Sequence, residues 1–136
     1  MSYLLDTNVC IGLINGTSSR VRQRYFQATS RGTLPATSSI VAHELWYGVA
    51  KSDRVPQNAE RLAAFLSSAV VVIEYSEKDA QAAGEIRAAL ESEGQRIGEY
   101  DTLIAGQAFS RSLILVTANT REFARVKGFI VEDWTV

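Results

Sequence analysis

The sequence contains a single cysteine, Cys10, among its 136 residues. One cysteine excludes an internal disulfide and any metal site built from paired thiolates. A chain of this length buries roughly 65–70% of the surface that its unfolded form exposes, so its core needs neither a disulfide nor a structural metal. The cysteine content favours a reducing compartment, and we expect the protein to be cytoplasmic.

Long hydrophobic runs are also missing. No apolar run approaches the 18 or so residues that cross a bilayer, and no cationic segment precedes the strand-like residues 3–5, so we expect no membrane contact and a chain used as synthesised. The 46% apolar and 21% charged composition excludes a disordered, collagen-like or coiled-coil chain. At about 150 residues per domain, we expect a single domain over residues 1–136.

Acidic residues are absent between Asp6 and Glu44, a stretch that holds four arginines. The balance reverses from Glu74 to Asp101, where eight acidic residues stand against three basic ones. The net charge of −1 therefore conceals local patches and does not exclude a polyanionic partner. Without a site nearby, the simplest interpretation of arginines spaced by two and four is a solvated helix face.

Short apolar runs alternate with helical patterns along the whole chain. Strands are expected at 3–5, 34–38, 69–73, 113–116 and 129–131. Helices are expected at 9–14, from a cap at 18 or 19 to 28, from a cap at 39 to 49, around 56–66, from a cap at 76 to about 93, at 101–109 and briefly from 119. This alternation predicts an α/β fold, a three-layer sandwich with a central, mostly parallel sheet.

Two of the predicted strands, 69–73 and 113–116, are apolar without alternation, which implies burial on both faces of a parallel sheet. In such sheets ligands bind at the carboxyl ends of the strands. Asp6 ends the first predicted strand and Asn119 follows the fourth, so we expect both to face the same crevice.

Three carboxylates stand where composition alone does not explain them. Glu44 lies on or beside the apolar stripe of its predicted helix, where a buried acid must find a cation or a proton. Its structural alternative is an ion pair with an arginine. Asp6 and Asp101 are both suited to cap a helix, the first before Val9 and the second before Leu103. Taken singly, none of the three identifies a site.

Taken together, these carboxylates indicate a cation. Three carboxylates within about 5 Å would repel by roughly 3 kcal/mol per pair at an effective dielectric constant of 20. An oxygen-preferring divalent cation offsets that repulsion, and without a thiolate or imidazole cluster the natural choice is Mg²⁺ or Mn²⁺. Such ions serve phosphoryl chemistry by generating hydroxide and neutralising charge on the phosphate.

Four segments follow one another in a fixed order: LDTN at 5–8, HEL at 43–45, GEYDTLIA at 98–105 and LVTANTREF at 115–123. In order and spacing they resemble the PIN-domain ribonucleases, and most closely the VapC-type toxins of bacterial toxin–antitoxin pairs. The resemblance covers essentially the whole chain and implies a PIN-like sandwich. It also implies a Mg²⁺- or Mn²⁺-dependent endoribonuclease that cuts single-stranded or loop RNA, often tRNA, and is silenced by a cognate antitoxin protein.

The resemblance carries metal-site and catalytic roles onto Asp6, Glu44 and Asp101. Members of the family often place a fourth acid directly after the fourth strand, where this sequence has Asn119. We assign the fourth role to Glu122, one helical turn later, as an outer ligand or water holder, although 119–122 also has the pattern of a capping box. Supporting roles are implied for Asn8, Thr117, which would hydrogen-bond a metal-bound water, and Asn119.

The arginines become candidates for RNA binding once a site of this kind is expected. They are Arg20, Arg24, Arg121 and Arg125, and we expect them to contribute affinity without chemistry. His43, the only histidine, points about 100° away from Glu44 on a helix and is expected at a surface or interface. Trp46 and Tyr47 could stack on a base or pack between subunits, and packing is favoured.

We also expect a homodimer, formed through apolar helix surface in the 60–66 or 39–49 region. Two other functions stay open. A receiver-type phosphoacceptor domain is also α/β, but it needs paired acids after the first strand and a late lysine, and no lysine lies between Lys78 and Lys127. A catalytically weak PIN fold that only binds RNA or a partner stays open because of Asn119.

Overall fold

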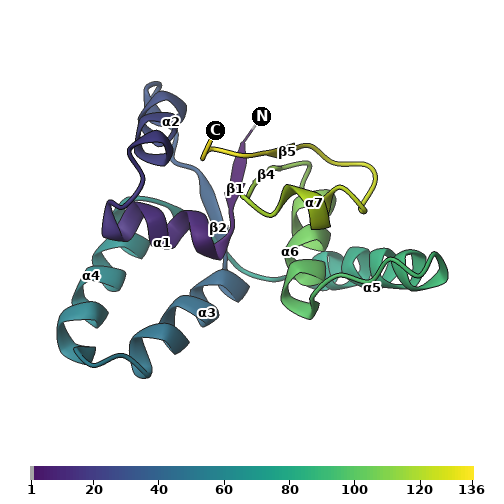
Figure 1. The fold of residues 1–136 in the computed structure, drawn as a ribbon, viewed down its shortest axis with the longest axis horizontal. Coiled ribbons are helices and arrows are strands. Elements are labelled where there is room, and N and C mark those ends of the chain that lie inside the picture. The colour runs from purple at the N-terminus through teal and green to yellow at the C-terminus, as the bar shows by residue number, and fades with distance from the viewer. Residues whose placement is uncertain (1) are drawn as a thin grey trace.

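The computed structural model describes residues 2–136, which fold into an α/β sandwich around one parallel sheet (Figure 1). The strands are β1 (Tyr3–Leu5), β2 (Ala36–Ser38), β3 (Val71–Ile73), β4 (Ile114–Val116) and β5 (Val131–Glu132). The helices are α1 (Thr7–Asn15), α2 (Ser19–Thr29), α3 (Ser39–Ala50), α4 (Val55–Ser68), α5 (Glu77–Ser92), α6 (Glu99–Ser110) and α7 (Thr120–Phe123). The predicted fold class and the order of elements are confirmed.

The sheet has the strand order β3-β2-β1-β4-β5, and every pair of neighbours is parallel. The chain first builds outward from β1 through β2 to β3, then returns to place β4 on the other side of β1. Leu5 pairs with Thr37 on one side and with Val116 on the other. The topology therefore switches direction between β1 and β4, and a crevice at their carboxyl ends is expected to bind a ligand.

The core lies along the central strands. Leu4 and Leu5 of β1 and Leu115 and Val116 of β4 are completely buried, which confirms the predicted burial of strand 113–116. The same prediction is wrong for 69–73, because Val71 of β3 is 51% exposed. β3 lies at one edge of the sheet, so its side chains are only partly covered.

Helix starts follow the predicted caps at three places. The Asp6 carboxylate accepts the N–H of Val9 at 3.1 Å and Ser18 caps α2. Ser76 and Asp79 form a complete capping box at the start of α5. Each cap satisfies backbone donors that a helix leaves free at its first turn.

Three cap predictions are wrong. Ser39 is the first residue of α3 and not its cap, because the Ser38 hydroxyl accepts the N–H of Ile40 at 3.0 Å. Asp101 is not the cap of α6, because Gly98 occupies that position and Asp101 lies in the first turn. Asn119 does not form a capping box with Glu122, because its side chain accepts no backbone N–H. Instead its amide donates to the Glu122 carboxylate, which also accepts the N–H of Gly98 at 3.2 Å. The carboxylate is therefore directed toward the start of α6 and away from its own helix end.

Helices α5 and α6 pack unusually closely. A Cβ at Gly106 would lie 2.6 Å from Ala83, a distance that no larger residue at 106 could keep. The small residues let the helix backbones approach, and α5 thereby fixes the position of α6. In the part of the chain that the structure describes, no helix combines the length and the apolar character needed to cross a membrane.

Candidate active site at the carboxyl edge of the sheet

Asp6 lies at the carboxyl end of β1, beside the end of β4. Its backbone N–H donates to the carbonyl of Val116 at 3.1 Å, which continues the β1–β4 pairing by one residue. The side chain is buried and hydrogen-bonds the hydroxyl of Thr117 and the N–H of Val9. Burial raises its pKa, with a further contribution from the charge of Glu44, although these hydrogen bonds oppose the rise.

Glu44 projects from α3 and is half-buried. Its Oε1 atom accepts a hydrogen bond of 2.8 Å from the hydroxyl of Thr7, the residue directly after Asp6. Among residues 2–136 no lysine or arginine pairs with Glu44, so the expected ion pair with an arginine is absent there. The carboxylate is held by a neutral hydroxyl, and its charge is left without a partner of opposite sign.

Asp101 and Glu122 lie within hydrogen-bonding reach of each other. Burial, the hydrogen bond to Glu122 and the charges of Glu122, Asp6 and Glu44 raise the pKa of Asp101 to about 6. The amide of Asn119 lowers the pKa of Glu122. In the metal-free chain, protonation of the pair below about pH 6 therefore takes place at Asp101, which then donates to an ionised Glu122.

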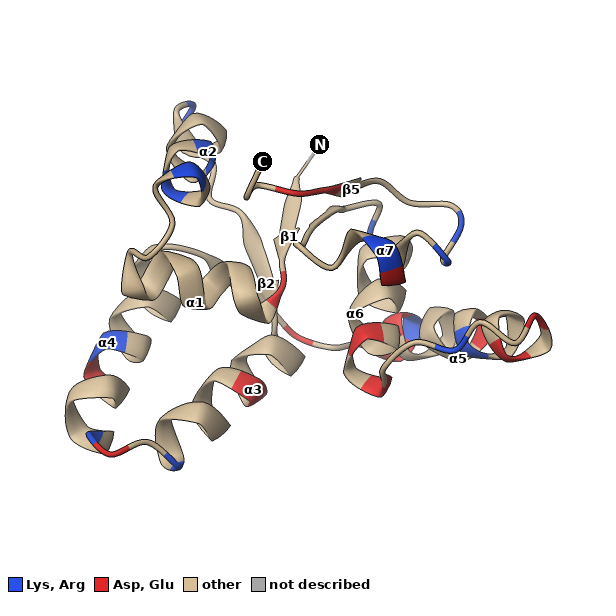
Figure 2. Ribbon diagram, viewed as in Figure 1, with Lys and Arg blue, Asp and Glu red and all other residues tan. Residues whose placement is uncertain are grey.

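The four predicted acids are thus brought to one edge of the sheet from four separate elements. In Figure 2 the red positions at the end of β1, on α3, at the start of α6 and on α7 surround the same region. Asp101 senses the charges of the other three acids. A single electrostatic environment joins residues that lie up to 116 positions apart in the chain.

The donor set at this edge fits a hard divalent cation, because it consists of carboxylate oxygens. Burial, followed by the neighbouring acids, raises the pKa of Asp101 there, so a bound cation would favour its ionised form. The arrangement is nevertheless open, since no three Asp, Glu, His or Cys side chains within residues 2–136 lie close enough to enclose a metal ion as they stand. Mutual repulsion keeps such carboxylates apart, and a bound cation would offset that repulsion.

The supporting residues differ in their surroundings. Thr117 is fully buried, and its hydroxyl accepts the N–H of Asn119 at 3.0 Å while contacting Asp6. Asn119 is exposed and orients Glu122 through its amide. Asn8 is exposed on the first turn of α1.

Sequence reasoning missed Thr7, whose hydroxyl positions Glu44. The available signal was its place directly after Asp6 at the end of the first strand. A hydroxyl there can turn toward any element that packs over the strand ends. Its partner on α3 is 37 residues away and follows only from the tertiary structure.

The predicted RNA-binding arginines lie on two separate elements, α2 and the α7 region (Figure 2). Arg20 and Arg121 are exposed. Arg24 pairs with Glu132 at 3.3 Å and so links α2 to β5. Arg125 donates to the carbonyl of Arg96 at 2.8 Å and contributes to the lowered pKa of Glu122. Arg24 and Arg125 therefore have structural contacts that a merely solvated face would lack.

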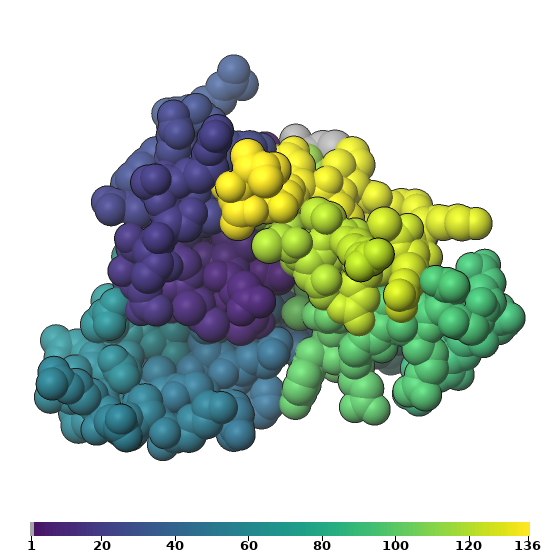
Figure 3. Space-filling view, viewed as in Figure 1, coloured from purple at the N-terminus to yellow at the C-terminus, as the bar shows by residue number. Residues whose placement is uncertain are grey.

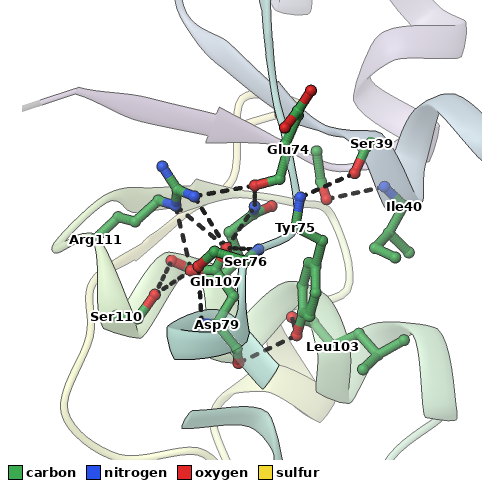
Figure 4. A network of polar contacts seen from close by, with 11 residues as sticks. Ser39, Ile40, Glu74, Tyr75, Ser76, Asp79, Leu103, Gln107, Ser110 and Arg111 are labelled. Carbon is green, nitrogen blue, oxygen red and sulfur yellow. Dashed lines mark hydrogen bonds and ion pairs between the residues drawn. The ribbon is translucent and has the colours of Figure 1, made fainter. Parts of the chain in front are cut away.

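A second buried carboxylate, Asp79, lies outside this acidic edge (Figure 4). It pairs with Arg111 at 3.1 Å and accepts hydrogen bonds from Gln107 at 3.0 Å, from Ser110 and from the N–H of Ser76. Burial opposes its ionisation, but these donors, led by Arg111, outweigh burial and lower the pKa of Asp79. Asp79 is therefore ionised and fully paired.

A groove of about 270 Å³ runs between α1, α3 and α4 and reaches the acidic edge. Its walls include Ile11, Leu45 and Leu62, and Glu44 and Arg61 add charge. Arg61 is held in place by a hydrogen bond of 2.9 Å to the carbonyl of Ile14. The groove thus joins apolar surface to one of the four acids.

Residues 3–128 match the PIN domain family. The chain is 40% identical over 135 residues to the tRNA(fMet)-specific endonuclease VapC of Shigella flexneri, a match that spans 99% of both proteins. It is also 40% identical over 134 residues to ribonuclease VapC2 of Rickettsia felis, with 98% of each covered.

Solved structures show the same likeness. VapBC2 of Rickettsia felis, bound to a DNA fragment from its promoter, matches with a TM-score of 0.89 and 38% identity over 98% of this chain and 99% of that one. DNA-bound VapBC of Salmonella typhimurium matches with a TM-score of 0.89 and 40% identity, and 98% of each chain is covered.

Proposed function

The chain belongs to the PIN domain family, among the VapC ribonucleases, and from this premise we propose that it is the endoribonuclease toxin of a toxin–antitoxin pair. The observation that carries the proposal is the convergence of four acids at the carboxyl edge of the sheet, where the pKa of Asp101 rises to about 6. Carboxylates gathered without a structural cation serve the chemistry of a divalent metal ion.

We assign the metal ligands as Asp6, Glu44 and Asp101, with Glu122 as an outer ligand or water holder. Bound Mg²⁺ or Mn²⁺ would lower the pKa of a water molecule and neutralise charge that builds up on the scissile phosphate. Two of the three ligands have a neutral partner that orients them. Thr117 contacts Asp6 and Thr7 donates to Glu44 at 2.8 Å. The hydroxyls fix these carboxylates without neutralising the charge that attracts the cation.

Glu122 has a different part in this scheme. Two donors, the Asn119 amide and the Gly98 N–H, hold its carboxylate ionised beside Asp101. In the metal-free chain below about pH 6, it accepts a hydrogen bond from the protonated carboxyl of Asp101. With a cation bound at Asp101, Glu122 would be an oriented acceptor for a water molecule. Asn119 thus acts through Glu122 and takes no part in the chemistry directly.

For the substrate, we propose RNA with tRNA as the leading class. This assignment comes from the relatives, since two proteins at 40% identity over nearly the whole chain carry the name tRNA(fMet)-specific endonuclease. The acidic edge itself makes no distinction among RNAs. Exposed arginines on α2 and α7 provide positive charge for the phosphate backbone beyond the site.

For the partner, we propose an antitoxin whose segment carries a basic side chain to the acidic edge. The structural neighbours at 38–40% identity are VapBC assemblies. The groove between α1, α3 and α4 offers apolar walls that end near Glu44. A cation from the antitoxin would offset the same repulsion as a metal ion, and it would therefore compete with the metal.

The test is cleavage of total RNA and of purified tRNA with Mg²⁺ or Mn²⁺, with and without a chelator. We expect cleavage by the wild-type chain, none with chelator and none by Asp6→Asn. The matched control is Asp53→Asn, the same isosteric change at an exposed acid between α3 and α4. Cleavage that survives both the chelator and Asp6→Asn would contradict the proposed site. RNA binding without any cleavage would favour a catalytically weak binding protein.

A further inference from the structure

His43 and Tyr100 form a pair that links α3 to α6. The Tyr100 hydroxyl lies 3.3 Å from Nε2 of His43, within hydrogen-bonding distance. The two ring centroids are 5.8 Å apart, and the rings are inclined by 42°. The contact joins residues 57 positions apart, so it depends on how the two helices are placed.

The pair lies directly beside the acidic edge. His43 precedes Glu44 and Tyr100 precedes Asp101, so each ring lies on the same helix turn as a proposed metal ligand, about 100° around the helix from the carboxylate. Both rings are exposed, and Tyr100 retains 47% of its accessible surface. In the space-filling view, the blue-teal atoms of α3 and the green atoms of α6 flank a notch at the lower edge of the molecule (Figure 3).

The exposed ring surface continues along α3. Tyr47 follows His43 by four residues, one helical turn, and is 60% exposed. The ammonium group of Lys51, another turn along, lies 4.7 Å from the centre of the Tyr47 ring. Aromatic faces beside the carboxylates are thus followed by a positive charge.

We propose that His43 and Tyr100 form a platform on which an unpaired base of the RNA substrate stacks, next to the phosphate that is cut. This inference rests on the proposed function and extends it to the recognition of a base. Proteins that bind single-stranded RNA stack its bases on exposed aromatic rings and bind its phosphates with cations. The hydrogen bond between the two side chains holds both rings in place before RNA arrives.

The position of the pair favours RNA over a second copy of this chain. A two-fold contact through this surface would bring the Glu44 and Asp101 of the second copy close to those of the first. Like charges at close range repel, so such a contact would add to the repulsion already present at the acidic edge. An RNA base is uncharged and adds no charge of its own to the carboxylates.

The experiment measures binding in an Asp6→Asn background, which keeps the RNA intact. The probes are a single-stranded RNA of mixed sequence and a ribose-phosphate chain of equal length without bases. Their affinity ratio isolates the contribution of the bases from that of the phosphates. We expect a ratio of about 5- to 150-fold in favour of the RNA with bases, the range for stacking of one base.

Tyr100→Leu in that background should remove most of this preference, while Tyr100→Phe keeps the ring and should retain it. The matched control is Phe109→Leu at the other end of α6, because Phe109 is 45% exposed and undergoes the same loss of a ring. Light scattering on every variant follows the oligomeric state. The platform is supported if the preference for RNA with bases depends on Tyr100 while the oligomeric state of the variants stays unchanged.

Several results would overturn the platform. They are equal affinity for the two probes in the Asp6→Asn chain, a preference that Tyr100→Leu leaves intact, and a preference lost only together with the oligomeric state. Failure of the proposed function gives a different pattern. A chain that shows the ring-dependent preference but never cuts RNA keeps the platform and loses the nuclease, whereas binding of neither probe removes both.

Discussion

Asp79 and Asp101 lie on two helices that pack against each other, yet their surroundings shift their pKa values in opposite directions. Asp79 on α5 is almost completely buried, and donors led by Arg111 lower its pKa. Asp101 on α6 is half-buried, and its burial together with three neighbouring acids raises its pKa to about 6. The more deeply buried carboxylate is thus the one that ionises more easily.

The difference teaches that burial alone does not reveal the role of a carboxylate. Around Asp79 every partner is a hydrogen-bond donor, and one of them carries positive charge. Such a carboxylate connects elements of the fold. Around Asp101 the partners are acceptors with negative charge. The repulsion between these carboxylates costs stability, and proteins retain such an arrangement where a ligand relieves it. The two aspartates therefore define a structural and a functional region on adjacent helices.

The largest expected effect is on cleavage. Asp101→Asn should lower RNA cleavage by more than about 100-fold, because loss of a direct metal ligand exceeds the 10–100-fold cost of losing an outer-shell partner. Its melting temperature should stay equal or rise, since one repelling charge is removed. Asp79→Asn, the same substitution on the neighbouring helix, should lower the melting temperature and leave cleavage by the folded protein intact. Equal loss of cleavage in both variants would break the comparison.

Truncation of the Asp79 side chain has the largest expected effect on stability. Asp79→Ala leaves Arg111, Gln107 and the N–H of Ser76 without their shared acceptor. We expect a loss of about 3 kcal/mol, below the upper range for breaking a buried pair because Arg111 is partly exposed. This corresponds to a drop of roughly 10 °C in melting temperature. Thermal unfolding measures it, and a drop no larger than that of Asp53→Asn would contradict the structural role.

The two aspartates should respond to pH with opposite signs in the metal-free protein. An aspartate in an unfolded chain titrates near about 3.9. Asp79 has a lower pKa when folded, so its contribution to stability is present above about pH 4 and is lost as the pH falls through the folded value. Asp101 has a folded pKa of about 6, so its protonation favours the folded state. Its contribution to stability is therefore present below about pH 4 and is lost as the pH rises from about 4 to 6.

Urea unfolding of the wild type and two variants at a series of pH values separates these effects. The disadvantage of Asp79→Ala against the wild type should shrink as the pH falls from about 4 toward the lower folded pKa of Asp79. Asp101→Asn should gain an advantage above about pH 6 and show none near pH 4. Parallel curves for all three proteins would show that neither pKa differs between the folded and unfolded states.

The smallest expected effect concerns the arginines, which lie outside both aspartate regions. Arg121→Ala should flatten the dependence of log K on log salt concentration by about 0.7 for single-stranded RNA if the guanidinium contacts one phosphate. Turnover at saturating substrate should hardly change, because such a contact binds ground state and transition state alike. Salt titrations of RNA binding measure the slope, and an unchanged slope in both Arg121→Ala and Arg20→Ala would leave these arginines as a solvated face.

Local chemistry explains why much of the fold could be predicted from the sequence. Asp6, Ser18 and Ser76 cap helices through contacts with residues three positions away, and apolar runs define strands over three to five residues. The parallel sheet followed because strands alternate with helices. Its carboxyl edge then indicated where Asp6 and the residues after the fourth strand would meet.

Only the tertiary structure decided the features that depend on packing between distant elements. An apolar run cannot tell a central strand from an edge strand, so the exposure of Val71 was missed. The Asn119–Glu122 pattern suits a capping box, but a carboxylate that can reach Gly98 is held there instead. Likewise the sequence placed Asp79 at a helix start but could not pair it with Arg111, 32 residues later. Hydrogen bonds within one helical turn depend on neighbouring residues in the sequence, whereas charge environments arise where helices pack. These charge environments give Asp79 and Asp101 opposite pKa shifts.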